Sequence, residues 1–163
     1  MATVTIIPAA SISDIEAVCA LFREYEKSLS FSLAFQGFEA ELASLPAPYI
    51  PPRGSLLVAK SGFDYLGVVG LKPLSVETAE IKRLYVVPEA RGCGVGRMLL
   101  TRIIEDARLK GYQRVRLDSH RGSMTTAITM YRGLGFIEIP PYGPDLGGEI
   151  AFFEKCLDDT TNK

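Results

Sequence analysis

The chain has 163 residues, 47% of them hydrophobic, which suits a single domain with one packed core over residues 1–163. Its 18 basic and 19 acidic residues give a net charge of −1, so composition predicts neither a nucleic-acid nor a membrane partner. No apolar stretch is long enough to span a bilayer, and the N-terminus lacks the features of a signal peptide. We therefore expect a cytoplasmic protein.

The three cysteines and the single histidine limit the kinds of metal site. Cys19, Cys93 and Cys156 are odd in number and far apart, which argues against a disulfide framework or a zinc site. His120 is the only histidine, so one chain cannot build a site from several histidines. We expect no bound metal.

The first half of the chain is predicted to contain a strand, two helices and a hairpin. The first helix has N-cap candidates at Ser11–Ser13 and an apolar stripe of Ile12, Ile15, Cys19 and Phe22. A proline-rich loop at 46–54 separates the second helix from the hairpin. In chain order we expect a strand at 4–7, helices at 13–28 and 38–45, and strands at 55–60 and 65–71.

The second half alternates strands with helices. The longest helix carries a periodic stripe of Val95, Met98, Leu99, Arg102 and Ile103 and ends at a glycine. The expected elements are a strand at 79–87, a helix at 94–109, a strand at 114–118, a helix at 123–134, and strands at 136–139 and 149–157. A hairpin mixed with such units cannot give an all-parallel sheet. The pattern therefore predicts an α+β, or mixed α/β, domain.

A glycine-rich loop separates the strand that ends before Pro88 from the long helix. Glycines allow consecutive backbone N–H groups to converge, and a helix N-terminus favours an anion, so the loop could hold a pyrophosphate. It lacks the third glycine of a dinucleotide fingerprint and the Lys-Ser/Thr ending of a P-loop. A plain strand-to-helix turn stays an open alternative. The segment is Arg91-Gly92-Cys93-Gly94-Val95-Gly96-Arg97.

Three segments stand out together, namely Glu80–Pro88, Arg91–Gly96 and Tyr131–Phe136. In their order and spacing they resemble the GNAT superfamily of N-acetyltransferases. The resemblance covers most of the chain and implies a splayed mixed sheet flanked by about four helices. It also implies acetyl-CoA as co-substrate, bound where the sheet opens, with its pyrophosphate on the glycine loop.

The resemblance also implies roles for individual residues. The backbone of Leu84, Tyr85 and Val86 would pair with the pantetheine arm, and the loop residues Arg91, Gly92, Cys93, Gly94, Val95, Gly96 and Arg97 would bind the pyrophosphate. Tyr131 matches the tyrosine that points toward the CoA sulfur, and Glu80 occupies a position where several members carry a general base. Met124 departs from the family, which often has a CoA-contacting asparagine there.

The residues themselves leave alternatives open. Glu80 could remove a proton from the amine, or it could be an ion-pair partner of Lys82, Arg83 or another cation. We place it on one strand face with Lys82, Leu84 and Val86, unless a bulge shifts that face. Tyr131 could stabilise the departing thiolate or only pack.

Several other residues have both a functional and a structural interpretation. Cys93 could be a nucleophile at a helix start but is interpreted as loop filler. His120 could belong to the acceptor site but is interpreted as a solvated turn residue. The aromatic residues Tyr25, Phe31, Phe35 and Phe38 could line an acceptor pocket or pack between helices, and Tyr142 could belong to an acceptor site.

We expect an enzyme that transfers the acetyl group of acetyl-CoA directly to a primary amine of a small molecule or peptide. The alternative is a non-catalytic acyl-CoA-binding regulatory module, which Met124 keeps open. Glu80 and Tyr131 favour the enzyme, and a homodimer is compatible with either function.

Overall fold

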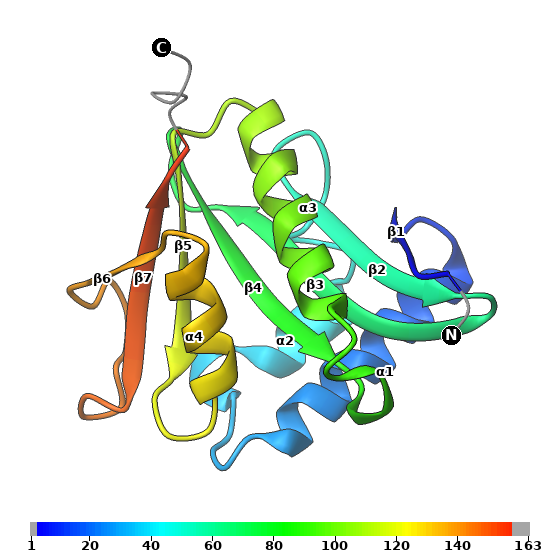
Figure 1. Cartoon of the computed structure of the whole chain (residues 1–163), viewed down its shortest axis with the longest axis horizontal. Helices are drawn as coiled ribbons and strands as arrows, with labels where there is room; N and C mark the ends of the chain where they lie inside the picture. The colour runs from blue at the N-terminus through cyan, green and yellow to red at the C-terminus, as the bar shows by residue number, and fades with distance from the viewer. Residues whose placement is uncertain (1–2, 158–163) are drawn as a thin grey trace.

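The computed structural model describes residues 3–157, which form one seven-stranded sheet with helices on both faces (Figure 1). The strand order is β1-β2-β3-β4-β5-β7-β6, and all neighbours are antiparallel except β4 and β5. This arrangement confirms the predicted α+β class. The strands are β1 Thr5–Pro8, β2 Ser55–Ser61, β3 Asp64–Pro73, β4 Thr78–Val86, β5 Arg114–His120, β6 Ile137–Ile139 and β7 Ile150–Cys156.

Four α-helices accompany the sheet, close to the predicted positions. They are α1 Ile12–Ser28, α2 Phe38–Ser44, α3 Val95–Leu109 and α4 Thr125–Gly133. Two short 3₁₀ helices, Ala34–Gln36 and Pro88–Ala90, were not predicted. Within residues 3–157, no helix combines the length and the apolar character needed to cross a membrane.

The helix stripes are rotated from the predicted ones by about one position. In α1, Val18, Leu21 and Phe22 are buried, whereas Ile12 is 80% exposed. Ser11 and Asp14 form a capping box that fixes the start of this helix. The buried stripe of α3 consists of Val95, Leu99, Leu100, Ile103, Ile104 and Ala107. Met98, which was predicted to lie on this stripe, is 39% exposed.

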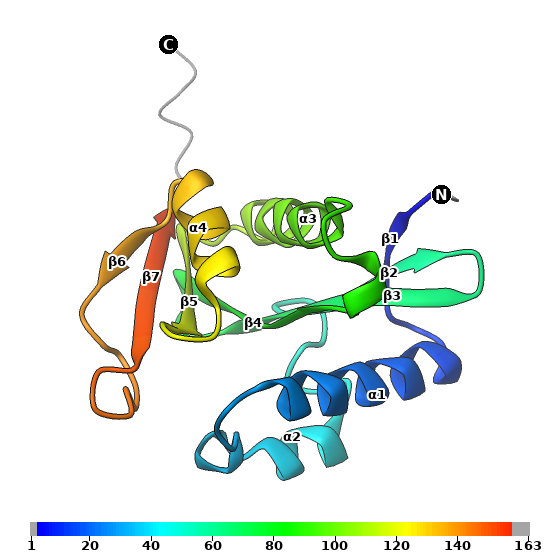
Figure 2. The ribbon, with the colours of Figure 1, turned by 60° about the horizontal axis from the view of Figure 1, so that its bottom comes forward.

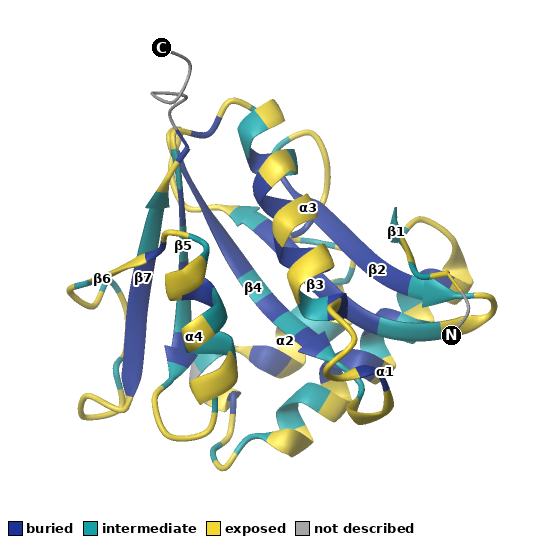
Figure 3. Cartoon of the chain, viewed as in Figure 1, coloured by how far each residue is buried: buried dark blue, intermediate teal, exposed yellow. Residues whose placement is uncertain are grey.

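The two faces of the sheet carry separate hydrophobic clusters. Helices α1 and α2 cover one face, and α3 and α4 cover the other (Figure 2). The central strands are buried between these layers (Figure 3). The α1 side is centred on Phe22, Phe38 and Tyr49, and the α3 side on Leu99 and Ile103. A site that opens through the sheet can therefore be lined from both layers.

The parallel strands β4 and β5 pair only at their beginnings. Their register runs from Thr78–Arg114 to Glu80–Arg116, after which the strands diverge (Figure 1). From Ile81 onward, β4 has no strand partner on that side within the described chain. This divergence opens the sheet at its centre.

A β-bulge in β4 redirects the side chains around this opening. The register with β3 shifts between Val68–Tyr85 and Gly70–Lys82, and Arg83 has a φ of 62°. Such a conformation is costly for a non-glycine residue, by roughly 1–2 kcal/mol. The buried Arg83 guanidinium binds the Glu41 carboxylate at 2.9 and 3.0 Å, which opposes this cost.

The bulge decides which residues of β4 share a face. Before the bulge, Ile81 packs on the α3 side, and after it Leu84 packs there, so the alternation changes phase. Lys82 and Arg83 both reach Gln36 on the opposite side. Glu80, Lys82, Leu84 and Val86 therefore do not share one face, because the bulge, which the sequence left open as the exception, interrupts simple alternation.

Candidate active site

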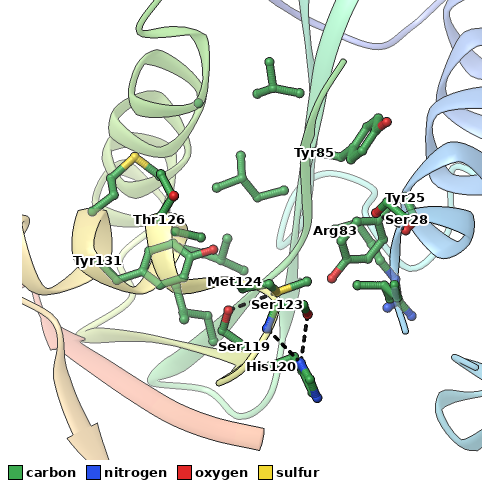
Figure 4. A pocket seen from close by; sticks show the side chains of 18 of the residues that line it. Tyr25, Ser28, Arg83, Tyr85, Ser119, His120, Ser123, Met124, Thr126 and Tyr131 are labelled. Atoms are coloured by element: carbon green, nitrogen blue, oxygen red, sulfur yellow. Dashed lines mark hydrogen bonds between the residues drawn. The ribbon is translucent and has the colours of Figure 1, made fainter. Parts of the chain in front are cut away.

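A cavity of about 590 Å³ lies where β4 and β5 diverge (Figure 4). It receives residues from the α3 layer, from the α1 layer and from both strands, so it passes through the opening in the sheet. On the α3 side its walls include Arg91, Gly92, Gly94, Val95, Gly96, Arg97, Met124, Thr126, Ala127, Met130 and Tyr131. On the α1 side they include Tyr25, Ser28, Leu29, Phe31, Leu33 and Gln36.

The glycine loop forms one end of the cavity. Gly92 and Gly94 have φ values of 78° and 83°, a region that disfavours L side chains, and Gly94 is the N-cap of α3. The guanidinium of Arg91 donates to the Val86 carbonyl at 3.0 Å, which ties the loop to the end of β4. Exposed backbone at a helix start, with Arg91 and Arg97 beside it, fits a pyrophosphate.

The free edge of β4 forms the middle of the cavity. Leu84, Tyr85 and Val86 all line it, and the edge has no strand partner on the β5 side within residues 3–157. An extended amide chain could pair with this edge as an added strand would. The predicted pantetheine-contacting residues are therefore brought together with the predicted pyrophosphate loop.

Tyr131 belongs to both the core and the cavity. Its ring packs against Phe136 and Phe153, with centroid distances of 5.9 and 6.2 Å. Its hydroxyl points toward the centre of the cavity (Figure 4). Burial raises the pKa of the Tyr131 hydroxyl well above its ordinary value, so the group stays protonated and can donate a hydrogen bond. The packing and functional interpretations are thus compatible.

Glu80 does not line the cavity. It is 4% exposed; its carboxylate accepts a hydrogen bond from the Tyr142 hydroxyl at 2.8 Å and lies 3.6 Å from the Lys72 ammonium. Lys82, which does line the cavity, is 3.9 Å away. The structure thus shows ion-pair contacts of Glu80 with Lys82 and with another cation, Lys72, whereas Arg83 pairs with Glu41. The role of Glu80 as a base stays a prediction.

Asp118 is a cavity carboxylate that the sequence interpretation missed. It lies on β5, two positions beyond the last residue paired with β4. Its Oδ2 atom is 3.3 Å from the ammonium of Lys82, across the opening. Asp118 also acts on Tyr25 of α1. Burial raises the pKa of the Tyr25 hydroxyl to about 12, and the negative charge of Asp118 acts in the same direction. A signal existed in the sequence, because Asp118 stands at the expected end of a strand.

His120 is not the solvated turn residue that the sequence suggested. It is the last residue of β5, and its side chain is only 12% exposed. The ring lies against Phe31, 4.8 Å between centroids, and Nδ1 accepts a hydrogen bond from the Ser123 backbone N–H at 3.1 Å. His120 therefore joins the α1–α2 connection to the loop before α4.

The remaining candidates separate into cavity and non-cavity residues. Met124 lines the cavity and contacts the Ser119 hydroxyl through its sulfur at 3.1 Å. Cys93 is exposed and lies outside the cavity lining. Phe38 is a buried core residue, and Tyr142 binds Glu80 instead of facing the cavity. The side chain of Phe35 lies outside the described part of the structure.

Comparison with known proteins agrees with this geometry. The model of the acetyltransferase (GNAT) family matches residues 16–136, and the chain therefore belongs to that family. An uncharacterized N-acetyltransferase of Schizosaccharomyces pombe is 36% identical over 124 residues, which cover 75% of this chain and 76% of that protein. The resemblance inferred from the β4, loop and α4 segments is thereby confirmed.

Solved structures show the same fold. A GNAT-family acetyltransferase from Staphylococcus aureus superposes with a TM-score of 0.79 at 20% identity, covering 96% of this chain and all of that chain. PaiA N-acetyltransferase from Thermoplasma acidophilum, whose structure contains coenzyme A, gives a TM-score of 0.72 at 22% identity, with 94% and 99% covered. At these identities the likeness establishes the fold.

Proposed function

We propose that this protein is an N-acetyltransferase that moves the acetyl group of acetyl-CoA to a primary amine by direct transfer. The observation that carries the proposal is the single cavity through the opened sheet. It has an anion-suited glycine loop at one end and a carboxylate, Asp118, beside the α1 layer. One cavity lined from both layers gives two substrates a place to meet, which supports direct transfer.

Acetyl-CoA, when bound, supplies an activated thioester. The backbone N–H groups of the 91–97 loop and the Arg91 and Arg97 side chains would hold its pyrophosphate. The free edge of β4 at Leu84–Val86 would orient the pantetheine arm. Family membership and the coenzyme A found in the Thermoplasma protein support this choice of co-substrate.

Acetyl transfer to an amine requires removal of a proton from the nitrogen, because an amine with a pKa of roughly 10.4 is mostly protonated at pH 7. We assign this task to the linked carboxylates of Asp118 and Glu80, with Asp118 in contact with the cavity and Glu80 behind Lys82. The Tyr131 hydroxyl, on the α4 side, would donate a hydrogen bond to the departing sulfur.

The proposal treats residues 1–163 as one acetyl-CoA-binding domain, since both layers that line the cavity pack on one sheet. A cytoplasmic location is part of the proposal and rests on the sequence alone. The acceptor would be a small molecule or a peptide.

Two measurements on the intact protein test the proposal. Calorimetric titration with CoA should show binding, and thiol release from acetyl-CoA should depend on an added primary amine. Binding and turnover together support the enzyme. Binding of CoA without turnover, across a broad amine panel, would instead support the non-catalytic acyl-CoA-binding module.

A further inference from the structure

The α1 side of the cavity has a wall that is mainly apolar and aromatic. It includes Tyr25, Leu29, Phe31, Leu33 and Ile150. The ring contact between Phe31 and His120 extends this wall from the α1–α2 connection to the end of β5. Surfaces of this kind bind apolar and aromatic groups through burial and ring contacts.

One carboxylate faces this wall. Asp118 is the sole Asp or Glu among the described residues that line the cavity. Its Oδ2 pairs with Lys82, while no described residue donates a hydrogen bond to its Oδ1. An ammonium group could therefore reach Oδ1 and form a charge-assisted hydrogen bond.

The two cations at this end already have partners. Lys82 lies between Asp118, at 3.3 Å, and Glu80, at 3.9 Å, and its side chain is 10% exposed. Arg83 is bound by Glu41 and Gln36 and is 5% exposed. Neither cation is placed to recognise a carboxylate on the acceptor, and a second ammonium on the acceptor would find no further carboxylate among the described residues that line the cavity.

We propose that the acceptor is a monoamine with an apolar, preferably aromatic, body and no carboxylate next to the amine. Its ammonium group binds Asp118, and its body lies against the wall that contains Leu29 and Phe31. This inference rests on the proposed function and narrows its acceptor class. The inferred acceptor class includes arylalkylamines and excludes polyamines and free amino acids.

Three acceptors test the inference with acetyl-CoA. 2-Phenylethylamine has the aromatic body and one amine, phenylalanine adds a carboxylate to the same body, and spermidine adds amines without a ring. We expect kcat/KM for 2-phenylethylamine to exceed that for either other amine by at least about tenfold, which corresponds to roughly 1.4 kcal/mol. Preference for spermidine or phenylalanine would overturn the acceptor inference while leaving the transferase proposal standing.

A variant pair tests the wall itself. Phe31→Ala should raise KM for 2-phenylethylamine about tenfold and leave CoA affinity unchanged. Phe63→Ala is the matched control, because Phe63 is 97% exposed in the β2–β3 turn, and it should leave both unchanged. Equal KM values for the wild type and Phe31→Ala would remove Phe31 from the acceptor site and contradict the inference.

A binding measurement gives a readout besides activity. 2-Phenylethylamine titrated into the protein saturated with CoA should bind, and Phe31→Ala should weaken this binding about as much as it raises KM. Absence of turnover with every amine, with CoA binding intact, would refute the proposed function and with it the acceptor class. The two failures are therefore distinguishable.

Discussion

Lys82 on β4 and Asp118 on β5 form an ion pair across the opening of the sheet, with 3.3 Å between Nζ and Oδ2. The pair spans the gap just beyond the last backbone pairing of these strands, Glu80–Arg116. It therefore bridges two strands that no longer share hydrogen bonds there. Because both side chains line the cavity, the pair also places one positive and one negative charge on the cavity wall.

The carboxylate that accepts the amine proton can be identified by comparing two variants. Asp118→Asn should lower kcat/KM by a factor on the order of 10²–10⁴, because it removes the carboxylate that lines the cavity. The loss should be largest at low pH, where little neutral amine is present, and smaller as pH approaches the amine pKa. Rates measured from about pH 6 to 10 check this.

Glu80→Gln should have a smaller effect on these rates, because Glu80 does not line the cavity and contacts it only through Lys82. Asp64→Asn, an exposed position at the start of β3, should have none. If Glu80→Gln gives the large, pH-dependent loss and Asp118→Asn does not, Glu80 is the base that the sequence predicted.

Tyr131→Phe should reduce kcat while changing stability little, because the ring keeps its contacts with Phe136 and Phe153. Since burial raises the pKa of Tyr131, the wild type should not lose activity through deprotonation of this hydroxyl up to about pH 10. Turnover under chemistry-limited conditions and urea unfolding are the two measurements. An unchanged kcat would leave Tyr131 as a packing residue only.

Gly94→Glu should abolish CoA binding in calorimetry by placing a side chain and a negative charge at the start of α3. Gly111→Glu is a control for backbone strain, because Gly111 also has a positive φ, 90°, but lies past the other end of α3. Both variants should lose roughly 1–2 kcal/mol of stability. If folded Gly94→Glu binds CoA like the control, the loop is not the pyrophosphate site.

Asp14 should make stability depend on pH. Hydrogen bonds from Tyr65 and from the backbone of Ala10 and Ser11 lower the pKa of Asp14 from 3.8 to about 2. A lowered folded-state pKa stabilises the fold above the ordinary value, and this contribution is lost as pH falls from about 4 to about 2. Asp14→Asn should therefore lower the free energy of unfolding at pH 7, because the amide lacks the negative charge that these hydrogen bonds stabilise.

Urea unfolding of Asp14→Asn and wild type at pH 7 and pH 3 checks this dependence. The stability difference between the two proteins should be smaller at pH 3. A difference that does not change with pH would mean that Asp14 acts without its charge.

Local patterns predicted most elements of the fold. Capping residues at Ser11 and Asp14, the glycine that ends α3, and the prolines around β4 mark chain positions, so boundaries came within one or two residues. The resemblance placed Tyr131 and the glycine loop, which do meet in one cavity. These features depend on residues that are close to one another in the chain, so the sequence alone is enough to predict them.

The centre of the site could not be predicted in the same way. The bulge at Arg83 depends on the register with β3 and on the distant Glu41, neither of which is visible in the β4 sequence. Simple alternation without the bulge would place Glu80 on the same face as Leu84 and Val86. Asp118 became a candidate only when the divergence of β4 and β5 placed it beside Lys82.

The most direct test of acetyl transfer is a mass measurement of the products formed from acetyl-CoA and 2-phenylethylamine. We expect one equivalent of free CoA for each equivalent of N-acetylated amine, and no acetylated protein as a reaction intermediate. CoA release without an acetylated amine, with this and every other primary amine tried, would contradict it.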